Sequence, residues 1–310
     1  MSALFIPKLY VRPDSELEIV EKAQTLLVRA ECLGTLPTPI DRLFETAKIS
    51  EVELDRSEML SLWTRFSAGA KRMVSGAMGI INQIRGAADL RRRVVFMPRD
   101  DSRARVFFAR AHELGHLALP WHKLNEDYLD SDKTLSHRIN ERFEIEANLF
   151  AAETVFQGAR FKEMARQYSP DFASNLELAN RHGTSLQATF WRFAEVHDEA
   201  LAGVTYYPAK KGATAEAVQA GFVIYKFVRS TAFAKRFGSM TVPGRLDAGH
   251  EWATARFARQ QPMLGEIPLQ FEGRAEPFLW EAFWNGYCLM VLVRRKPVLH
   301  SLARLIGRAA

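Results

Sequence analysis

His112-Glu113-Leu114-Gly115-His116 is an H-E-x-x-H stretch, and it decides how the surrounding chain is expected to fold. On a helix, this spacing places two imidazoles one turn apart on the same face, with a carboxylate between them. The flanking residues favour a helix over residues 103–119, because apolar side chains recur on one face and Pro120 ends the periodic stretch. Residues 93–97 predict a short strand directly ahead of this helix.

Two histidines at this spacing supply part of a zinc site. Catalytic zinc takes three protein ligands and leaves one position for water, so a third ligand must come from another segment. Glu144 is the favoured third ligand, on a helix predicted over residues 138–156, and the set implies one Zn²⁺ per chain. Asn148 lies one turn further along the same face and could hydrogen-bond His112, His116 or Glu144.

Other assignments of the acidic residues stay open at this point. Glu146 and Glu141 lie on the same predicted helix as Glu144 and are alternatives for the third ligand. These glutamates could also be exposed and form ordinary ion pairs along the helix surface. A helical wheel places Glu146 beside apolar residues and Glu144 beside Asn148, which favours Glu144.

Glu113 is predicted to act on a proton rather than on the ion. It sits between the two histidines and cannot easily bind the same ion, but it can reach a water in the open position. A carboxylate there can take a proton from the water and pass it to a leaving amine. The motif therefore predicts peptide-bond hydrolysis with Glu113 as the catalytic residue.

Other residues are weaker candidates for the same site. Between the two predicted metal-binding helices, which are joined by a loop predicted over residues 120–136, lie three side chains that could hydrogen-bond an oxyanion: Tyr128, His122 and His137. Cys288 could act as an inhibitory fourth zinc ligand, because thiolates bind zinc well. The chain has only 2 cysteines, too few for a disulfide framework, which agrees with a reducing compartment.

Charge is unevenly placed along the 310 residues. The net charge is +6, but residues 201–310 hold 15 Lys and Arg against 7 Asp and Glu. Arg294, Arg295 and Lys296, with nearby aromatic residues, are candidates for nucleic-acid contacts. The alternatives are a solvated basic face and an aromatic core. No apolar run is long enough to span a membrane and no signal peptide is evident, so we expect a cytoplasmic protein.

The change of composition along the chain predicts two domains and an α+β fold. Residues 1–200 are expected to form a mainly helical, zincin-like metallopeptidase domain with a small sheet, including a helix-turn-helix-like segment at 159–197. Residues 205–310 contain aromatic and β-branched stretches at 221–228, 278–283 and 287–293. These predict a smaller, basic α/β domain, and we expect a GAF-like or other sensor domain there.

Two blocks of this sequence resemble the ImmA/IrrE family of zinc metallopeptidases. The first is residues 107–117 around the motif, and the second is the run Glu144-Ile145-Glu146-Ala147-Asn148-Leu149-Phe150-Ala151-Ala152-Glu153. The resemblance implies Glu144 as the third ligand. It also implies cleavage of a helix-turn-helix repressor, which would release stress, DNA-damage or phage-defence genes. The basic C-terminal third is compatible with single-stranded DNA or another damage signal as activator. The alternative is a DNA-binding or signal-sensing regulator whose zinc site is structural or inactive.

Overall fold

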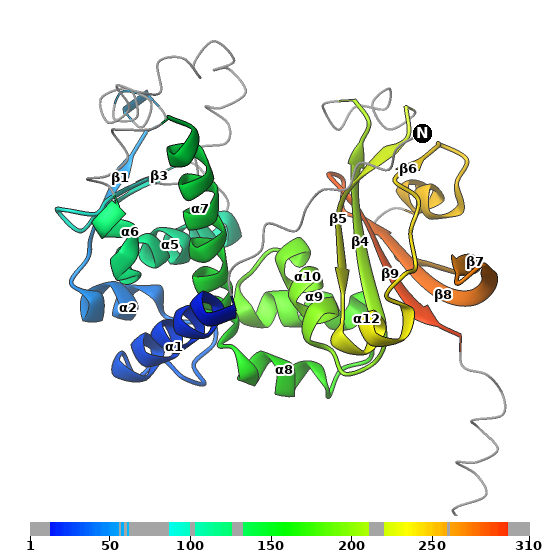
Figure 1. The fold of residues 1–310 in the computed structure, drawn as a ribbon, viewed down its shortest axis with the longest axis horizontal. Coiled ribbons are helices and arrows are strands. Elements are labelled where there is room, and N and C mark those ends of the chain that lie inside the picture. The colour runs from blue at the N-terminus through cyan, green and yellow to red at the C-terminus, as the bar shows by residue number, and fades with distance from the viewer. Residues whose placement is uncertain are drawn as a thin grey trace, which may run out of the picture. The chain divides into compact units, whose positions relative to one another are not determined.

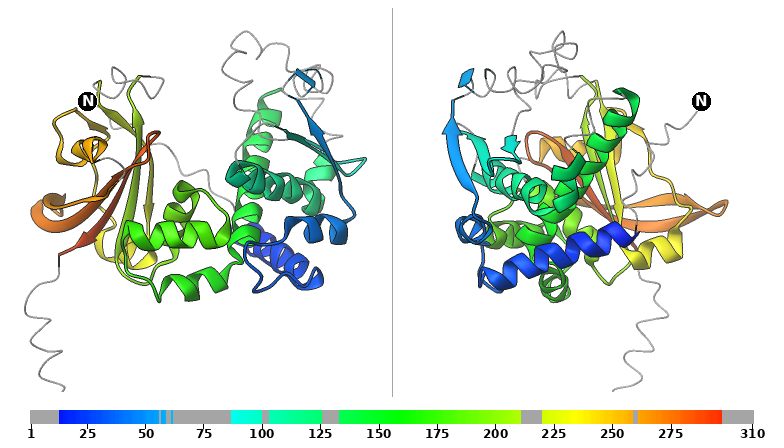
Figure 2. Two further views of the ribbon diagram at one scale, coloured as in Figure 1. Left: turned by 180° about the vertical axis from the view of Figure 1, so that it is seen from behind. Right: turned by 60° about the vertical axis from the view of Figure 1, so that its left-hand side comes forward.

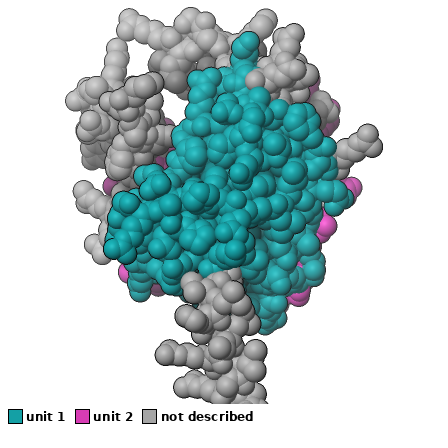
Figure 3. Space-filling model, turned by 90° about the vertical axis from the view of Figure 1, so that its right-hand side faces the viewer, with its two compact units in different colours: residues 1–3, 162–178, 186–310 teal, residues 4–161, 179–185 magenta. Residues whose placement is uncertain are grey.

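The computed structural model describes residues 13–55, 57–58, 61, 87–99, 103–125, 133–210, 220–258 and 261–296. The chain divides into two compact units, which Figure 3 colours separately. The first, here called the helical unit, comprises residues 4–161 and 179–185. The second, here called the sheet unit, comprises residues 1–3, 162–178 and 186–310. The predicted boundary between residues 200 and 205 stays a prediction.

Five helices build most of the helical unit (Figure 1). In chain order they are α1 (Pro13–Arg29), α2 (Ile40–Ala47), α5 (Arg103–Ala118), α6 (Pro120–Asn125) and α7 (Lys133–Phe156). The long helix α7 packs against both α5 and α1. The predicted helices over residues 103–119 and 138–156 are confirmed as α5 and as the larger part of α7.

Gly115 allows α5 and α7 to approach closely. A Cβ atom at this position would lie 3.1 Å from both the Cα and the carbonyl oxygen of Ala147, and 3.2 Å from the Cβ of Phe150. Those are backbone atoms or atoms next to the backbone, so they cannot yield without moving the helix. The glycine inside the motif therefore sets how near the two predicted ligand-bearing helices can lie.

The described part of the helical unit also contains a three-stranded sheet. Its strands are β1 (Ser50–Leu54), β2 (Ala87–Asp89) and β3 (Val94–Pro98), in the order β1-β3-β2. β3 runs parallel to β1 and antiparallel to β2. Val95 and Met97 of β3 are buried, so this strand anchors the start of the segment that leads into α5. The strand predicted at 93–97 is confirmed.

Three helices follow in the chain: α8 (Ala159–Ala165), α9 (Phe172–His182) and α10 (Leu186–Val196). Boundaries between the two units fall within α8 and within α9, whereas α10 belongs to the sheet unit. α9 and α10 are joined by a turn in which Gly183 has a φ of +66°, a conformation that favours glycine. Phe190 and Ala194 of α10 pack against Gly203 in the neighbouring strand. The second helix of the helix-turn-helix-like segment thus uses one face to build a core.

The sheet unit is a curled six-stranded antiparallel sheet (Figure 2). The strand order is β6-β5-β4-β9-β8-β7. The bounds are β4 (Leu201–Pro208), β5 (Phe222–Arg229), β6 (Arg245–Leu246), β7 (Met263–Phe271), β8 (Arg274–Trp284) and β9 (Leu289–Arg295), with the helix α12 (Thr231–Phe237) and the 3₁₀ helix η3 (Glu251–Phe257). The three strand segments predicted in this part of the chain correspond to β5, β8 and β9.

Apolar side chains fill both faces of this sheet. One face packs against α12 and η3 through a large core that includes Phe233, Trp252 and Phe278. The other face packs against α10 through a smaller cluster that includes Phe190 and Met290. The fold is therefore α+β, as predicted.

One local prediction was wrong. Residues 120–136 were expected to form a loop, but Pro120–Asn125 form the helix α6 and α7 begins at Lys133. Proline suits the first turn of a helix because its fixed φ is helical and its missing N–H has no partner there in any case. None of the helices that the structure describes has both the length and the apolar character needed to cross a lipid bilayer.

Candidate metal centre

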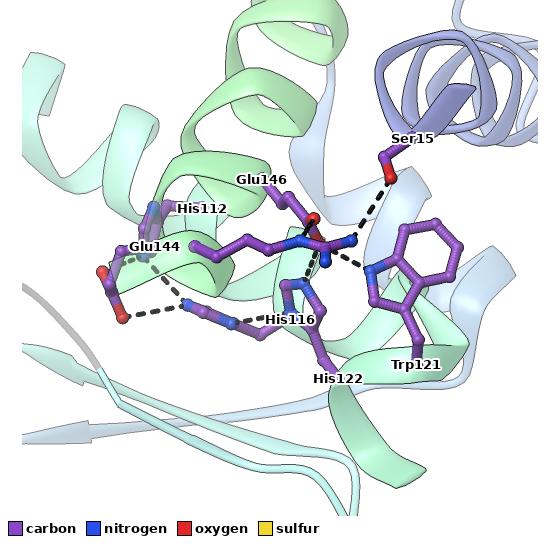
Figure 4. A network of polar contacts seen from close by, with 8 residues as sticks. Ser15, His112, His116, Trp121, His122, Glu144 and Glu146 are labelled. Atoms are coloured by element: carbon purple, nitrogen blue, oxygen red, sulfur yellow. Dashed lines mark hydrogen bonds and ion pairs between the residues drawn. The ribbon is translucent and has the colours of Figure 1, made fainter. Parts of the chain in front are cut away.

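Two packed helices bring the predicted ligands together. α5 carries His112 and His116 one turn apart, and α7 carries Glu144 opposite them (Figure 4). The two Nε2 atoms lie 3.1 Å apart. Glu144 Oε2 lies 3.3 Å from His112 Nε2, and Glu144 Oε1 lies 3.5 Å from His116 Nε2. Among the described residues, these three form a group whose potential ligand atoms all lie within 4.8 Å of one another.

This arrangement fits a tetrahedral ion. Donor atoms placed about 2.0–2.1 Å from zinc in a tetrahedron lie about 3.3 Å from one another. The shortest distances between the three side chains are close to that value, with a different oxygen of Glu144 nearest each imidazole, and two imidazoles with one carboxylate are a donor set that catalytic zinc uses. The two imidazoles beside it, that of His112 first, hold the pKa of the Glu144 carboxyl well below its usual range. Glu144 is therefore in the charged form that a cation requires.

Glu113 lies beside this group in a different environment. Its side chain is almost entirely enclosed, although it follows His112 directly in α5. Burial raises the pKa of Glu113 to about 7, with the positive charge of His112 opposing the shift. A carboxyl group with a pKa near neutrality can both accept and release a proton at physiological pH.

The two histidines have different partners at their Nδ1 atoms. His112 Nδ1 lies 3.1 Å from Asn148 Oδ1, and Asn148 is exposed on α7. His116 Nδ1 lies 3.0 Å from Nδ1 of His122, which is only 1% exposed. The predicted role of Asn148 in holding a motif histidine agrees with its contact with His112.

Glu146 lies on the far side of His122 from the group and anchors a buried part of the same polar network (Figure 4). This fully buried carboxylate accepts hydrogen bonds from Trp121 Nε1 at 2.6 Å and Arg142 Nε at 2.5 Å, and lies 3.1 Å from His122 Nε2. Burial alone would raise the pKa of Glu146, but these partners lower it to about 2. Glu146 is thus ionised and already coordinated by three donors, which removes it as an alternative third ligand.

Arg142 also ties this network to another helix. Its Nη2 donates to Ser15 Oγ of α1 at 3.2 Å. α1, α6 and α7 therefore meet around one buried carboxylate. Trp121 and the anchoring role of Glu146 were not foreseen from the sequence. The nearest signal was Pro120, which could have indicated the short helix that carries Trp121 and His122.

The structure describes the side chain of one of the three candidates for oxyanion binding, His122. Both ring nitrogens of His122 are engaged, one with His116 and one with Glu146, so this side chain has no donor left for an oxyanion. Tyr128 lies outside the described residues. His137 lies on α7, but its side chain is not among those described. For Tyr128 and His137 the oxyanion role stays a prediction.

Cys288 lies in the core of the sheet unit. It is fully buried in the cluster that includes Phe190 and Met290. Burial raises the pKa of this thiol to about 12, so it is protonated at neutral pH, whereas zinc binds the thiolate. These surroundings give no support to the predicted role as an inhibitory ligand.

The predicted nucleic-acid contacts lie at the end of β9. Arg295 Nη2 is 2.8 Å from Glu276 Oε2, and Lys296 Nζ is 2.7 Å from Glu266 Oε2. Two of the three cations are therefore neutralised locally, and Trp280 is 5% exposed within the core. Nucleic-acid contact by Arg294, Arg295 and Lys296 stays a prediction. The two ion pairs make it less favourable, because they already occupy Arg295 and Lys296.

The fold and the site together define a helical domain that presents two histidines and one glutamate from packed helices, with a buried glutamate beside them. Residues 77–192 match the model of a protein family described as the IrrE N-terminal-like domain, Peptidase_M78. Over these residues the chain is similar to this family, and the resemblance seen in the sequence is confirmed. His112, Glu113, His116 and Glu144 all lie within the matched residues.

A solved structure shows a similar fold over most of the chain. It is a Mycobacterium tuberculosis transcriptional regulator, with a TM-score of 0.53 and 14% sequence identity, covering 91% of this chain and 78% of that chain. At this identity the likeness concerns the fold alone. No curated protein matches the chain in sequence.

Proposed function

We propose that this chain is a zinc-dependent endopeptidase of the cytoplasm, with a zincin-like catalytic domain. The observation that carries the proposal is the placement of Glu113 beside His112, His116 and Glu144, whose side chains come within 3.1–3.5 Å of one another. The match of residues 77–192 to a peptidase family supports it. His112, His116 and Glu144 would hold the ion.

The chemistry then divides between the ion and Glu113. Zinc bound there would supply Lewis-acid activation of a peptide carbonyl and of water. Glu113 would accept a proton from the attacking water at its carboxylate and donate it to the leaving amine nitrogen. The burial that raises the pKa of Glu113 keeps these two transfers closely balanced near pH 7.

The substrate we propose is a helix-turn-helix repressor, and cleavage would release stress, DNA-damage or phage-defence genes. This part rests on the resemblance of the two ligand-bearing sequence blocks to the ImmA/IrrE family. The name of the structural relative, a transcriptional regulator, is compatible with a regulatory role. We assign residues 205–310 as the sensor domain, with single-stranded DNA or another damage signal as the activator.

The test uses the full chain, loaded with one equivalent of zinc, and a helix-turn-helix protein encoded beside its gene. We expect a single cleavage, stimulated by single-stranded DNA and followed by mass spectrometry of the products. The Glu113→Gln variant should bind zinc with unchanged stoichiometry and lose cleavage by at least about 100-fold, as expected for loss of general acid–base catalysis. Cleavage at the wild-type rate by this variant would show that Glu113 is not the proton carrier.

The alternative function is that of a regulator with a structural or inactive zinc site. The name of the structural relative, a transcriptional regulator, is compatible with this alternative as well. In that case the wild-type chain would cut no repressor even with the signal present. It would instead bind duplex DNA in a sequence-selective and salt-sensitive manner. Binding assays at two salt concentrations, alongside the cleavage assay, separate the two functions.

A further inference from the structure

A continuous chain of contacts leads from the candidate metal centre into the core of the helical unit. His116 Nδ1 lies 3.0 Å from His122 Nδ1, and His122 Nε2 lies 3.1 Å from Glu146 Oε2. His122 and Glu146 are both buried. The ring of His122 also stacks on Phe143, with ring centroids 4.2 Å apart, so its orientation is fixed from the side as well as from both ends.

The hydrogen-bond roles along this chain follow from the chemistry of its ends. The carboxylate of Glu146 can only accept, so His122 Nε2 must carry the proton of that contact. A neutral imidazole has one N–H, which leaves His122 Nδ1 as an acceptor. The contact between the two Nδ1 atoms then requires the proton to lie on His116. His116 Nε2 is then the nitrogen without a proton, and it lies 3.1 Å from His112 Nε2, from which it can accept in the absence of a metal.

We propose that His122 is a positioning residue, which transmits the anchoring of Glu146 to His116 and fixes His116 as the Nδ1–H tautomer that can bind a metal through Nε2. This role rests on the metal centre of the proposed function but not on its peptidase activity. Hydrogen bonds to the far nitrogen of a metal-binding histidine fix its tautomer and ring orientation and increase its basicity. Here an imidazole stands between the ligand and the carboxylate.

Three substitutions of His122 separate the two ends of the contact chain. In His122→Asn, the amide oxygen takes the place of Nδ1 and can still accept from His116. In His122→Gln, the amide nitrogen takes the place of Nε2 and can still donate to Glu146. In His122→Phe, the ring and its stacking on Phe143 are kept but both nitrogens are lost.

Zinc affinity of the full chain, measured by competition with a chromophoric chelator, is the first readout. We expect His122→Phe and His122→Gln to bind zinc about 10- to 100-fold more weakly, the usual effect of losing such a supporting contact. His122→Asn should stay within a few-fold of wild type. A variant that is folded by circular dichroism and keeps wild-type affinity without an acceptor facing His116 would overturn the proposal.

The second readout is the tautomer of His116, read from ring nitrogen shifts of ¹⁵N-histidine-labelled protein. The expected result is an Nδ1–H signal for His116 in wild type and in His122→Asn, and a mixture of tautomers in His122→Gln. An Nε2–H signal for His116 in the wild-type chain would overturn the proposal even if every variant misfolds. A wild-type chain that shows the Nδ1–H signal and binds zinc but cuts no repressor would refute only the proposed function.

Discussion

The two histidines of the motif are held in opposite ways. His112 contacts Asn148, an exposed amide that water can replace, whereas His116 contacts His122, which is buried and backed by the ionised Glu146. One ligand is therefore supported from the solvent side and the other from the core. The comparison indicates that the stability of the metal centre and that of the helical unit are coupled through His116 and only weakly through His112.

The largest expected effect comes from the residue that both histidines share. Glu144→Ala removes the only carboxylate among the three candidate ligands. Structural zinc binds with an apparent free energy of about 10–16 kcal/mol, to which each of a few ligands contributes. We therefore expect the substitution to cost about 3 kcal/mol of zinc-binding free energy, which weakens zinc affinity by more than 100-fold. Chelator competition measures this change, with Glu45→Ala on the exposed side of α2 as the matched control. Unchanged affinity in Glu144→Ala would transfer the third-ligand role elsewhere.

The second prediction tests the buried support of His116. Glu146→Gln removes the charge that Trp121, His122 and Arg142 contact, and we expect a lower free energy of unfolding of the metal-free chain by about 3 kcal/mol at pH 7. The pKa of Glu146 is lowered to about 2 from an ordinary value of 4.5. Its stabilising effect is therefore fully present above about pH 4.5 and is lost as the pH falls toward 2.

Urea unfolding of wild type and Glu146→Gln between pH 7 and pH 3 measures this dependence. Taking the difference between the two proteins removes the contribution of Glu113, whose raised pKa works in the opposite direction. The difference should shrink steadily below about pH 4.5. A difference that stays constant down to pH 3 would mean that the charge of Glu146 is not what stabilises the helical unit.

The third prediction concerns the exposed support of His112. Asn148→Ala should weaken zinc binding by about 10-fold, the low end for such contacts, because water can reach His112 Nδ1 once the amide is gone. Asn148→Asp should bind zinc at least as well as wild type, since a carboxylate is a stronger acceptor. Neither change should alter the free energy of unfolding by more than about 0.5 kcal/mol. A loss of stability comparable to that of Glu146→Gln would erase the distinction between the two histidines.

Much of this centre could be predicted from the sequence because its parts are local. The H-E-x-x-H spacing defines one helix face, and the apolar pattern around residues 144–151 defines the facing helix. The helical wheel also placed Glu146 beside apolar residues, in agreement with its burial. The choice of Glu144 as third ligand had the same basis.

The supporting contacts could not be predicted, because they depend on tertiary structure. The polar composition after Pro120 hid the helix α6, so His122 was expected in a loop and open to a substrate. Its contact with His116 requires α6 to fold back beside α5, which no spacing along the chain specifies. Likewise, the helical wheel indicated the apolar surroundings of Glu146 but not the three donors from α6 and α7 that hold its charge.

The smallest expected effect concerns the interface between α5 and α7, which supports both histidines. Gly115→Ala gains about 1 kcal/mol of helix propensity, but its Cβ meets the backbone of Ala147 at 3.1 Å, and overpacking of this kind costs about 1–3 kcal/mol. We expect a net loss of about 1 kcal/mol in the free energy of unfolding. Gly244→Ala, where a Cβ would meet no atom within 4 Å, is the control.

Because Gly115 sets the separation of α5 and α7, its substitution should affect both histidines equally. The contacts of His112 and of His116 with Glu144 cross this same helix interface, so the ring ¹⁵N shifts of both should move in Gly115→Ala. In Asn148→Ala and His122→Gln, by contrast, each substitution should move mainly its own partner's signals. If the ring ¹⁵N shifts of His116 alone changed in Gly115→Ala, the substitution would act on the buried contacts of His116 and not on the spacing of the two helices.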